Sequence, residues 1–257
     1  MRTNRTKAKL AHNELVLGVC VSSYSPDLVE LCAAAGFDFV TIDIEHEGVG
    51  YEEVAHMIRA AESFAITPIV RLQKNADEIL RFLDAGAQGI HVPRCNSAAD
   101  AQALVDATRF YPQGKRTFYA LGRSAKYSFD VDDREWSESA NRELLTIAMI
   151  EEVDGLNNLD EILATPYLDV IHVGPKDLWQ SMGMPEQAAV DEAVARITTS
   201  AIAAGKHVSL ILRLTDDVNA RIAGHVGRGA RMISCFPFDF VRRGGRAFLH
   251  DLHGLAC

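Results

Sequence analysis

The stretch DIEHEG, Asp43 to Gly48, places one histidine among three carboxylates directly after the apolar run FDFVTI. Histidine is the side chain that ordinarily changes its charge near neutral pH. Short apolar runs of this kind are typical of buried strands. The polar residues that follow this run are therefore expected at the edge of a sheet, where the strand ends. His46 is therefore a candidate general base.

Polar side chains follow four further apolar runs in the same way. Arg71 is the penultimate residue of TPIVRL, and Arg94 follows QGIHVP. Glu151 and Glu152 follow LLTIAMI, and Asp177 lies in a Gly-Pro-Lys-Asp turn after LDVIHV. In a barrel of parallel strands the carboxyl ends share one face, where active sites lie. Acidic, basic and guanidinium groups at five consecutive ends are therefore expected to converge.

These residue types suit the chemistry of a 2-keto acid held on a divalent metal ion. Glu151 and Asp177 are oxygen ligands with no cysteine or histidine cluster nearby, which favours Mg²⁺ or Mn²⁺. The metal would stabilise the enolate left when a C3 proton departs, helped by an arginine near the keto oxygen. A Schiff base is not indicated, because the nearest lysine, Lys176, lies in a Gly-Pro loop.

Each residue also has a purely structural interpretation. His46 could lie on the surface, and Arg71 could form a surface ion pair. Glu151 could serve a helix dipole, and Asp177 could cap a short helix. Asp84, in FLDAG, could be a helix-terminal carboxylate. The combination of groups at consecutive strand ends favours the catalytic interpretation.

Eight apolar runs are predicted strands: residues 15–23, 37–44, 67–72, 88–93, 144–151, 168–174, 207–214 and 230–236. They are rich in Val, Ile and Leu without alternation, which is typical of a parallel sheet covered on both faces. The segments between them repeat apolar residues every three or four positions, as helices packed on a sheet do. His91 and His172 fall inside two of the strands and are predicted to be core histidines.

Eight strand–helix repeats favour an α/β fold, a (β/α)8 TIM barrel that forms a single domain over residues 1–257. A doubly wound open sheet is the alternative, but no Gly-rich phosphate-binding loop supports it. The long segments 112–143 and 174–187 interrupt the repeat, as functional lids or contacts do. Residues 116–122 could add a strand, and a final helix beyond residue 239 is expected to break at Gly244-Gly245.

The composition excludes several classes of protein. The formal charge of −9, from 26 basic and 35 acidic residues, argues against a nucleic-acid or membrane partner. Five cysteines, without a C-x-x-C pair, are predicted to be buried reduced thiols. The first 14 residues lack the apolar core of a secretory signal, and no apolar stretch is long enough to cross a bilayer. A cytoplasmic protein is expected.

Five segments together resemble the HpcH/HpaI aldolase family, the metal-dependent class II pyruvate aldolases. They are FDFVTIDIEHEG, TPIVRL, FLDAGAQGIHVPRCNSAADAQALV, IAMIEEVDGLNNLDEIL and LDVIHVGPKDLWQSMG. The likeness covers most of residues 15–190 and weakens afterwards. D-x-E-H, I-E and G-P-x-D-L are specific in combination, although none is specific alone.

The resemblance implies a role for each matching position. His46 matches the catalytic base, and Arg71 matches the arginine that stabilises the transition state. Asp84 matches a carboxylate that raises the basicity of that histidine. Glu151 and Asp177 match the ligands of a divalent metal ion, Mg²⁺, Mn²⁺ or Co²⁺.

Further positions match substrate contacts of the family. Gly174, Pro175 and Lys176, with Asp177, match the turn that binds the substrate, where the backbone amide of Lys176 holds the substrate carboxylate. Arg123 matches an arginine in the loop after the fourth helix. Family members form hexamers that exchange a C-terminal helix. Because Asp84 is expected at the barrel end opposite His46, either the helix boundary differs or the pair forms across subunits.

Three departures from the family pattern concern the second substrate. Met149 replaces a glutamine two residues before the metal-binding glutamate. The loop KRTFYALGRSAKYS carries the bulky Phe118 and Tyr119 where the family has an Arg-Gly segment. Arg94 stands where the family often has an apolar residue, and this extra cation favours an acidic acceptor.

Three functions remain open from the sequence. The first is a lyase that cleaves 4-hydroxy-2-oxo acids to pyruvate and an aldehyde, or joins them. The second keeps the enolate but condenses acetyl-CoA with oxaloacetate, as citrate synthases of this fold do. The third is a non-catalytic barrel that binds a keto acid. The last is disfavoured because binding alone does not require a base.

Overall fold

The eight predicted strands form a closed parallel barrel in which each strand pairs with the next and β8 pairs with β1. The computed structural model describes residues 2–46 and 48–255. The strands are β1 (Val16–Val21), β2 (Phe39–Asp43), β3 (Thr67–Arg71), β4 (Gly89–Val92), β5 (Leu145–Ile150), β6 (Val170–Val173), β7 (His207–Ile211) and β8 (Met232–Cys235). The (β/α)8 prediction is confirmed, and the open-sheet alternative is wrong.

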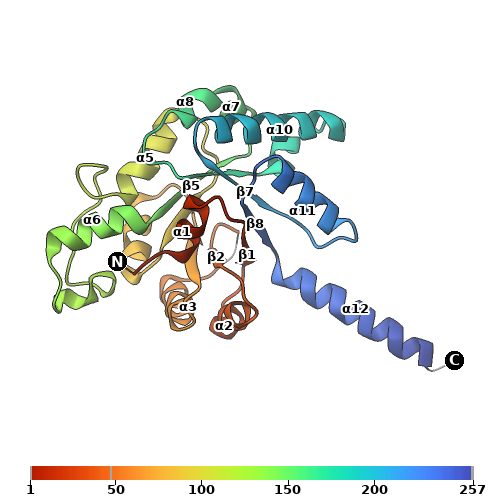
Figure 1. Cartoon of the computed structure of the whole chain (residues 1–257), viewed down its shortest axis with the longest axis horizontal. Coiled ribbons are helices and arrows are strands. Elements are labelled where there is room, and N and C mark those ends of the chain that lie inside the picture. Colours follow the sequence, from red (N-terminus) through yellow and green to blue (C-terminus); the bar gives the residue numbers. More distant parts are fainter. Residues whose placement is uncertain (1, 47, 256–257) are drawn as a thin grey trace.

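Helices surround the barrel as the three- and four-residue spacing predicts (Figure 1). They are α1 (Arg5–Ala11), α2 (Pro26–Ala34), α3 (Tyr51–Ser63), α4 (Ala76–Ala85), α5 (Ala98–Thr108), α6 (Asp133–Glu143), α7 (Val153–Asn157), α8 (Leu159–Leu163), α9 (Pro175–Ser181), α10 (Gln187–Ala203), α11 (Val218–Gly227) and α12 (Pro237–Leu255), with a 3₁₀ turn η1 (Arg123–Ser128). Side-chain oxygens of Ser25, Asn75 and Ser97 cap α2, α4 and α5, since each accepts a backbone N–H of the first turn.

The apolar core has two parts, which follow from strands that are covered on both faces. A small cluster inside the barrel fills the end that α1 covers. It consists of Leu10, Val16, Phe39, Ile69, Leu145, Ile147, Val170 and Met232. Gly18 leaves room there for the ring of Phe39, because an added Cβ would approach that ring to 2.4 Å. A larger cluster fills the space between the strands and the surrounding helices. The barrel is thus a packed scaffold that fixes its strand ends.

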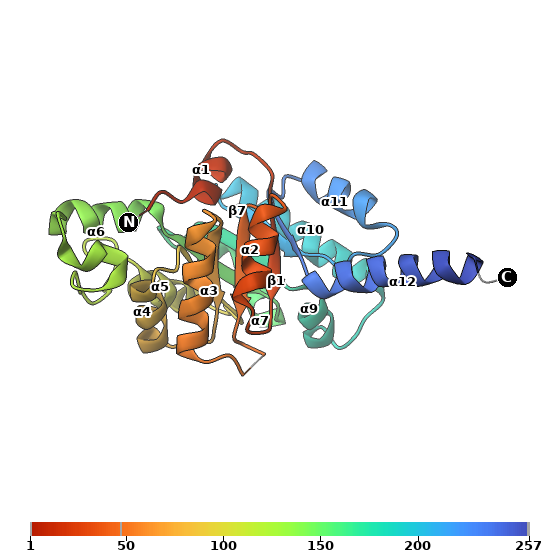
Figure 2. The ribbon, with the colours of Figure 1, turned by 90° about the horizontal axis from the view of Figure 1, so that it is seen from below.

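The two ends of the barrel are different. Figure 2 shows α1 at one end and α9 at the other. At the α1 end, Thr6 donates to the carbonyl of Asp38, and the side chain of Asn4 donates to the carbonyl of Gln88. Both acceptors precede strands, so α1 covers the amino ends. The opposite, carboxyl end remains for the polar residues that follow the strands.

Several predicted elements are wrong in detail. Residues 116–122 form no strand, and the long segment 112–143 instead contains η1 and α6. The predicted helix over GLNNLDEILAT is two short helices, α7 and α8, separated at Asn158. The helix α12 runs unbroken through Gly244-Gly245, because two glycines weaken a helix without ending it. Gly36, Gly86, Gly205 and Gly229 follow the ends of helices and have positive φ, a conformation that glycine adopts at low cost.

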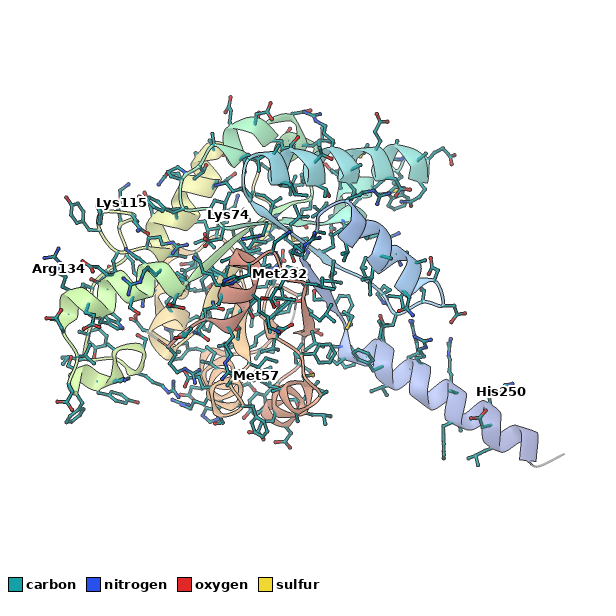
Figure 3. All side chains as sticks on the ribbon, in the orientation of Figure 1. Met57, Lys74, Lys115, Arg134, Met232 and His250 are labelled. Carbon is teal, nitrogen blue, oxygen red and sulfur yellow. The ribbon has the colours of Figure 1, made fainter. Side chains whose placement is uncertain are left out.

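The helix α12 projects away from the barrel, as the views in Figures 1 and 2 agree. Figure 3 places His250 on its distal part, far from Met232 at the barrel centre. Large apolar side chains along α12 are exposed, among them Phe238, Val241 and Phe248. This face has no cover among the described residues of one chain.

Four of the cysteines are buried free thiols, as predicted: Cys20, Cys32, Cys95 and Cys235. Burial raises the pKa of Cys20, Cys95 and Cys235 to about 12, so these thiols are inert near neutral pH. Cys257 lies outside the described residues. Within the described part of the chain, no helix combines the length and the apolarity needed to cross a bilayer.

Candidate active site

Residues that follow β2, β4, β5 and β6 line one cavity of about 390 Å³ at the carboxyl end of the barrel. Its lining consists of Glu45, His46, Arg94, Glu151, Glu152, Asp177, Gln180 and Ser181. All but the last two come from the strand ends that the sequence singled out. The predicted convergence of polar groups is therefore found in the fold.

Arg71 and Asp43 form a buried pair beside this cavity. They are register partners on β3 and β2, so their side chains leave neighbouring strands at the same height. The guanidinium Nε donates to Asp43 Oδ1 at 2.9 Å, and Nη2 donates to Oδ2. Burial lowers the pKa of Arg71. The hydrogen bond to Asp43 and the charges of Asp43 and Glu45 together outweigh this effect, so the pKa is raised overall. Arg71 is thus a fixed cation and not a surface ion pair.

Glu45 connects this pair with His46. Its Oε2 atom lies 3.7 Å from Arg71 Nε and 3.7 Å from His46 Nε2. The side chain of Glu45 is buried, whereas that of His46 is 65% exposed. The imidazole therefore faces the open side of the cavity, where it can meet a ligand or a neighbouring molecule. Glu47 lies outside the described residues.

Glu151 is held in a tight setting at the end of β5. Its Oε1 atom accepts the backbone N–H of Arg94 at 2.8 Å. The backbone of Gly174 passes so close that an added Cβ would lie 2.7 Å from Glu151 Cβ and 2.5 Å from Met149 Cε. Gly174 is therefore needed for the close approach of the β6–α9 turn to this carboxylate.

The surroundings of Glu151 disfavour its charge. Burial, followed by the negative charges of Asp177 and Glu45, raises the pKa of Glu151 to about 7, against the opposing hydrogen bond from Arg94. A buried carboxylate next to two others is the setting in which a bound cation offsets repulsion. Within the described residues no group of three or more metal-ligating side chains assembles. Two carboxylates fit Mg²⁺ or Mn²⁺, which keep several waters.

The raised pKa predicts how the stability of the metal-free protein depends on pH. An unfolded glutamate titrates near ~4.3, so the folded state holds the extra proton from there up to about 7. Stability contributed by the protonated form is lost as pH rises through this window. We expect Glu151→Gln to be more stable than the wild type at pH 8 by ~2 kcal/mol, after discounting for water at the cavity mouth.

Urea unfolding in the presence of a chelator at pH 5 and pH 8 measures this difference. The advantage of Glu151→Gln over the wild type should shrink at pH 5, where the wild-type carboxyl is protonated. An equal difference at both pH values would show that the titration of Glu151 is not its source.

The sequence model of one family matches residues 17–234, described as HpcH/HpaI aldolase/citrate lyase. The chain belongs to this family. The resemblance noted from the strand-end motifs is thereby confirmed, and with it the expectation of an aldolase-type lyase.

Individual relatives agree with this assignment. A hydroxypyruvate/pyruvate aldolase from Pseudomonas aeruginosa is 34% identical over 79% of this chain and 78% of its own. A 2-keto-3-deoxy-L-rhamnonate aldolase from an Escherichia coli strain is 32% identical over 77% and 74%.

Solved structures are also similar over nearly the whole chain. The citrate synthase SbnG shares 33% identity and a TM-score of 0.83, covering 97% of this chain and 98% of its own. An HpcH/HpaI aldolase from Desulfitobacterium hafniense DCB-2 shares 26% identity and a TM-score of 0.87, covering 96% and 95%.

Two residues that the family resemblance marks do not reach this cavity within one chain. Asp84 is in the last turn of α4, as the sequence predicted, and it accepts a hydrogen bond from Arg116 Nη2 at 2.8 Å. Burial raises the pKa of Asp84 against the opposing effect of Arg116. Arg123 pairs with Glu62 and lines a separate cavity of about 630 Å³ with Lys126 and Trp136. The helix boundary was therefore right, and an Asp84–His46 pair within one chain is not formed.

The side chain of Lys176 packs over the Trp179 ring, with Nζ 4.5 Å from the ring centre. Within the described residues, no hydrogen-bond acceptor is found for the backbone N–H groups of Lys176 and Asp177, which begin α9 after Pro175. This turn thus offers amide donors beside Asp177.

The two strand histidines lie in the barrel interior near Arg71. His91 and His172 are buried with ring centres 4.6 Å apart, and His172 Nδ1 lies 3.0 Å from Ser209 Oγ. Burial, and then the charge of Arg71, lowers the pKa of His172 to about 3. These rings are neutral core residues, which confirms the structural interpretation.

Proposed function

We propose that the protein is a divalent-metal-dependent aldolase that cleaves 4-hydroxy-2-oxo acids to pyruvate and an aldehyde and catalyses the reverse addition. One observation supports this most directly. The carboxylates of Glu151 and Asp177 line the same cavity as His46, and Arg71 is fixed 3.7 Å from Glu45 in that lining. Ligands for a cation, a base and a fixed guanidinium are thus available to one small molecule.

Glu151 and Asp177 are the residues that would hold Mg²⁺, Mn²⁺ or Co²⁺. Such an ion supplies Lewis-acid polarisation of the keto group and of the developing enolate. The substrate carboxylate would accept the free backbone N–H groups of Lys176 and Asp177 in the Gly174-Pro175-Lys176 turn. Arg71, fixed by Asp43, would donate to the keto oxygen as negative charge develops on it.

His46 would carry the proton, either directly or through a water molecule. In the cleavage direction it removes the proton of the C4 hydroxyl, the C3–C4 bond breaks, and the electron pair remains on the enolate of pyruvate. An aldehyde leaves, and the enolate is then protonated at C3. The exposed imidazole is compatible with this role because it faces the open side of the cavity.

The family pattern suggests that a neighbouring subunit completes the site. Asp84 and Arg123 would reach His46 and the substrate from that subunit, and α12 would be exchanged between subunits of a hexamer. The exposed apolar side chains of α12 support this proposal, since such surfaces are usually covered by a partner. A cytoplasmic location stays a prediction.

Metal-dependent release of pyruvate from a 4-hydroxy-2-oxo acid tests the proposal. We expect release with Mn²⁺ or Mg²⁺, and a loss of at least ~10²-fold in kcat for His46→Ala, because a positioned base contributes about that much. His56→Ala is the matched control, since His56 is an exposed histidine of α3 that contacts Tyr24. A His46→Ala variant as active as the His56→Ala control would contradict the role of His46.

Condensation of acetyl-CoA with oxaloacetate is the second candidate. The likeness to the citrate synthase SbnG over 97% of the chain favours it, as does Met149, which leaves an apolar contact beside Gly174. Free thiol that appears from acetyl-CoA only when oxaloacetate is present would support this reaction over aldehyde addition.

A further inference from the structure

Arg94 is a residue of the cavity that the proposed reaction leaves without a role. It lines the cavity together with Glu151 and Asp177, and its side chain is 46% exposed. We propose that Arg94 binds an anionic group of the acceptor, so that the preferred acceptor carries a carboxylate in addition to its reactive carbonyl. This inference rests on the proposed function and names the substrate class of that site.

The backbone of Arg94 fixes it beside the candidate metal ligand. Its N–H donates to Glu151 Oε1 at 2.8 Å, and its carbonyl accepts Lys74 Nζ at 2.8 Å. The residue has φ of 50°, a left-handed conformation that is costly for a side chain with a Cβ. These two backbone hydrogen bonds hold the strained residue in place. Its side chain therefore starts from a fixed point at the mouth of the cavity.

The guanidinium of Arg94 retains donors for a ligand. Its Nη2 atom donates to Gln73 Oε1, a neutral partner that orients the group without cancelling its charge. Among the described residues, the nearest carboxylate oxygen is Glu45 Oε1, which lies 3.9 Å from Nη2, at the limit of an ion pair. Within the described residues, Nε and Nη1 have no hydrogen-bond partner. Lys74 differs, because Asp100 already pairs with its ammonium group at 2.7 Å.

Among the described residues that line the cavity, Arg94 is the one arginine or lysine, so an incoming anion meets it first. Glu45 faces Arg71, and Glu152 accepts a hydrogen bond from Asn96. The other two carboxylates, Glu151 and Asp177, are the candidate metal ligands. A guanidinium is suited to a carboxylate because its planar donors match two oxygens. The proposed function assigns Arg71 to the keto oxygen of the donor, so Arg94 is left for the acceptor.

Acceptor selectivity tests the proposal. The kcat/KM for addition to pyruvate is measured with two matched pairs of acceptors: glyoxylate with acetaldehyde, and 4-oxobutanoate with butanal. The acid-to-neutral ratio is then compared between variants, because this ratio cancels any damage to the enolate step. We expect the wild type to prefer the acid in at least one pair, and Arg94→Gln to lower that ratio by about 10- to 100-fold, as for a lost charged hydrogen bond.

Two further variants separate this role from a structural one. Arg94→Lys should retain part of the acid preference, because it keeps a cation without the planar donors. Lys115→Gln should keep the wild-type ratio, since it removes a lysine charge that pairs with Asp106 and does not line the cavity.

An unchanged ratio in Arg94→Gln, or a wild type without any acid preference, would overturn the inference while leaving the aldolase proposal intact. A protein that adds pyruvate to none of the four acceptors and exchanges no pyruvate protons would overturn both.

Discussion

Exchange of the methyl protons of pyruvate with solvent is expected to fall by at least ~10³-fold in Asp177→Asn and in Glu151→Gln. Each substitution removes one of the two carboxylates that line the cavity, and loss of a metal ligand removes the stabilisation of the enolate. The neutral side chains keep the size of the originals. Glu151→Gln also keeps an oxygen to accept the N–H of Arg94, so the local fold should persist.

Proton NMR in heavy water, with Mn²⁺-free protein reconstituted with Mg²⁺, follows this exchange before any acceptor is known. Glu152→Gln is the matched control: it removes a carboxylate of the same cavity that is already bonded to Asn96, and we expect exchange within about threefold of the wild type. Exchange that continues in excess chelator would refute the metal dependence. Exchange lost equally in the Glu152→Gln control would refute the special role of the other two carboxylates.

The strand ends were the part of the site that sequence could predict. A parallel barrel presents all its carboxyl ends on one face, so residues distant in the chain converge once the strands are recognised. Glu45, His46, Arg94, Glu151 and Asp177 were found in this way. Their positions depend on where each strand ends, which the change from an apolar run to polar residues marks in the sequence.

Contacts that depend on helices and loops could not be predicted in the same way. The partner of Asp84 is Arg116, which follows an irregular loop, and no periodic pattern indicates which residues such a loop brings together. Gln180 and Ser181 line the cavity from α9 but carry no chemical signal of their own. The role of Asp43 was missed for a different reason: adjacent to a histidine motif, it was read as part of that motif and not as the anchor of Arg71. Its place at the end of β2, level with Arg71, was the available signal.

Arg71→Lys is expected to lower kcat for pyruvate proton exchange by about 10²- to 10³-fold, with a smaller change in KM. A fixed donor aimed at a developing oxyanion contributes about that much. Lysine keeps the charge but cannot make the two parallel hydrogen bonds by which Asp43 holds the guanidinium. The loss therefore measures orientation as well as charge.

Asp43→Asn tests whether the orientation comes from this carboxylate. Asp43 is buried, and removing its charge leaves the buried Arg71 without its main partner, which typically costs about 3–5 kcal/mol. We expect lower stability in urea together with a fall in kcat that approaches that of Arg71→Lys. In the double variant the two losses in kcat should not add, because both act through the position of one guanidinium. If the fold losses in kcat of the two single variants multiply in the double variant, Asp43 has only a structural role. Other contacts would then orient Arg71 for catalysis.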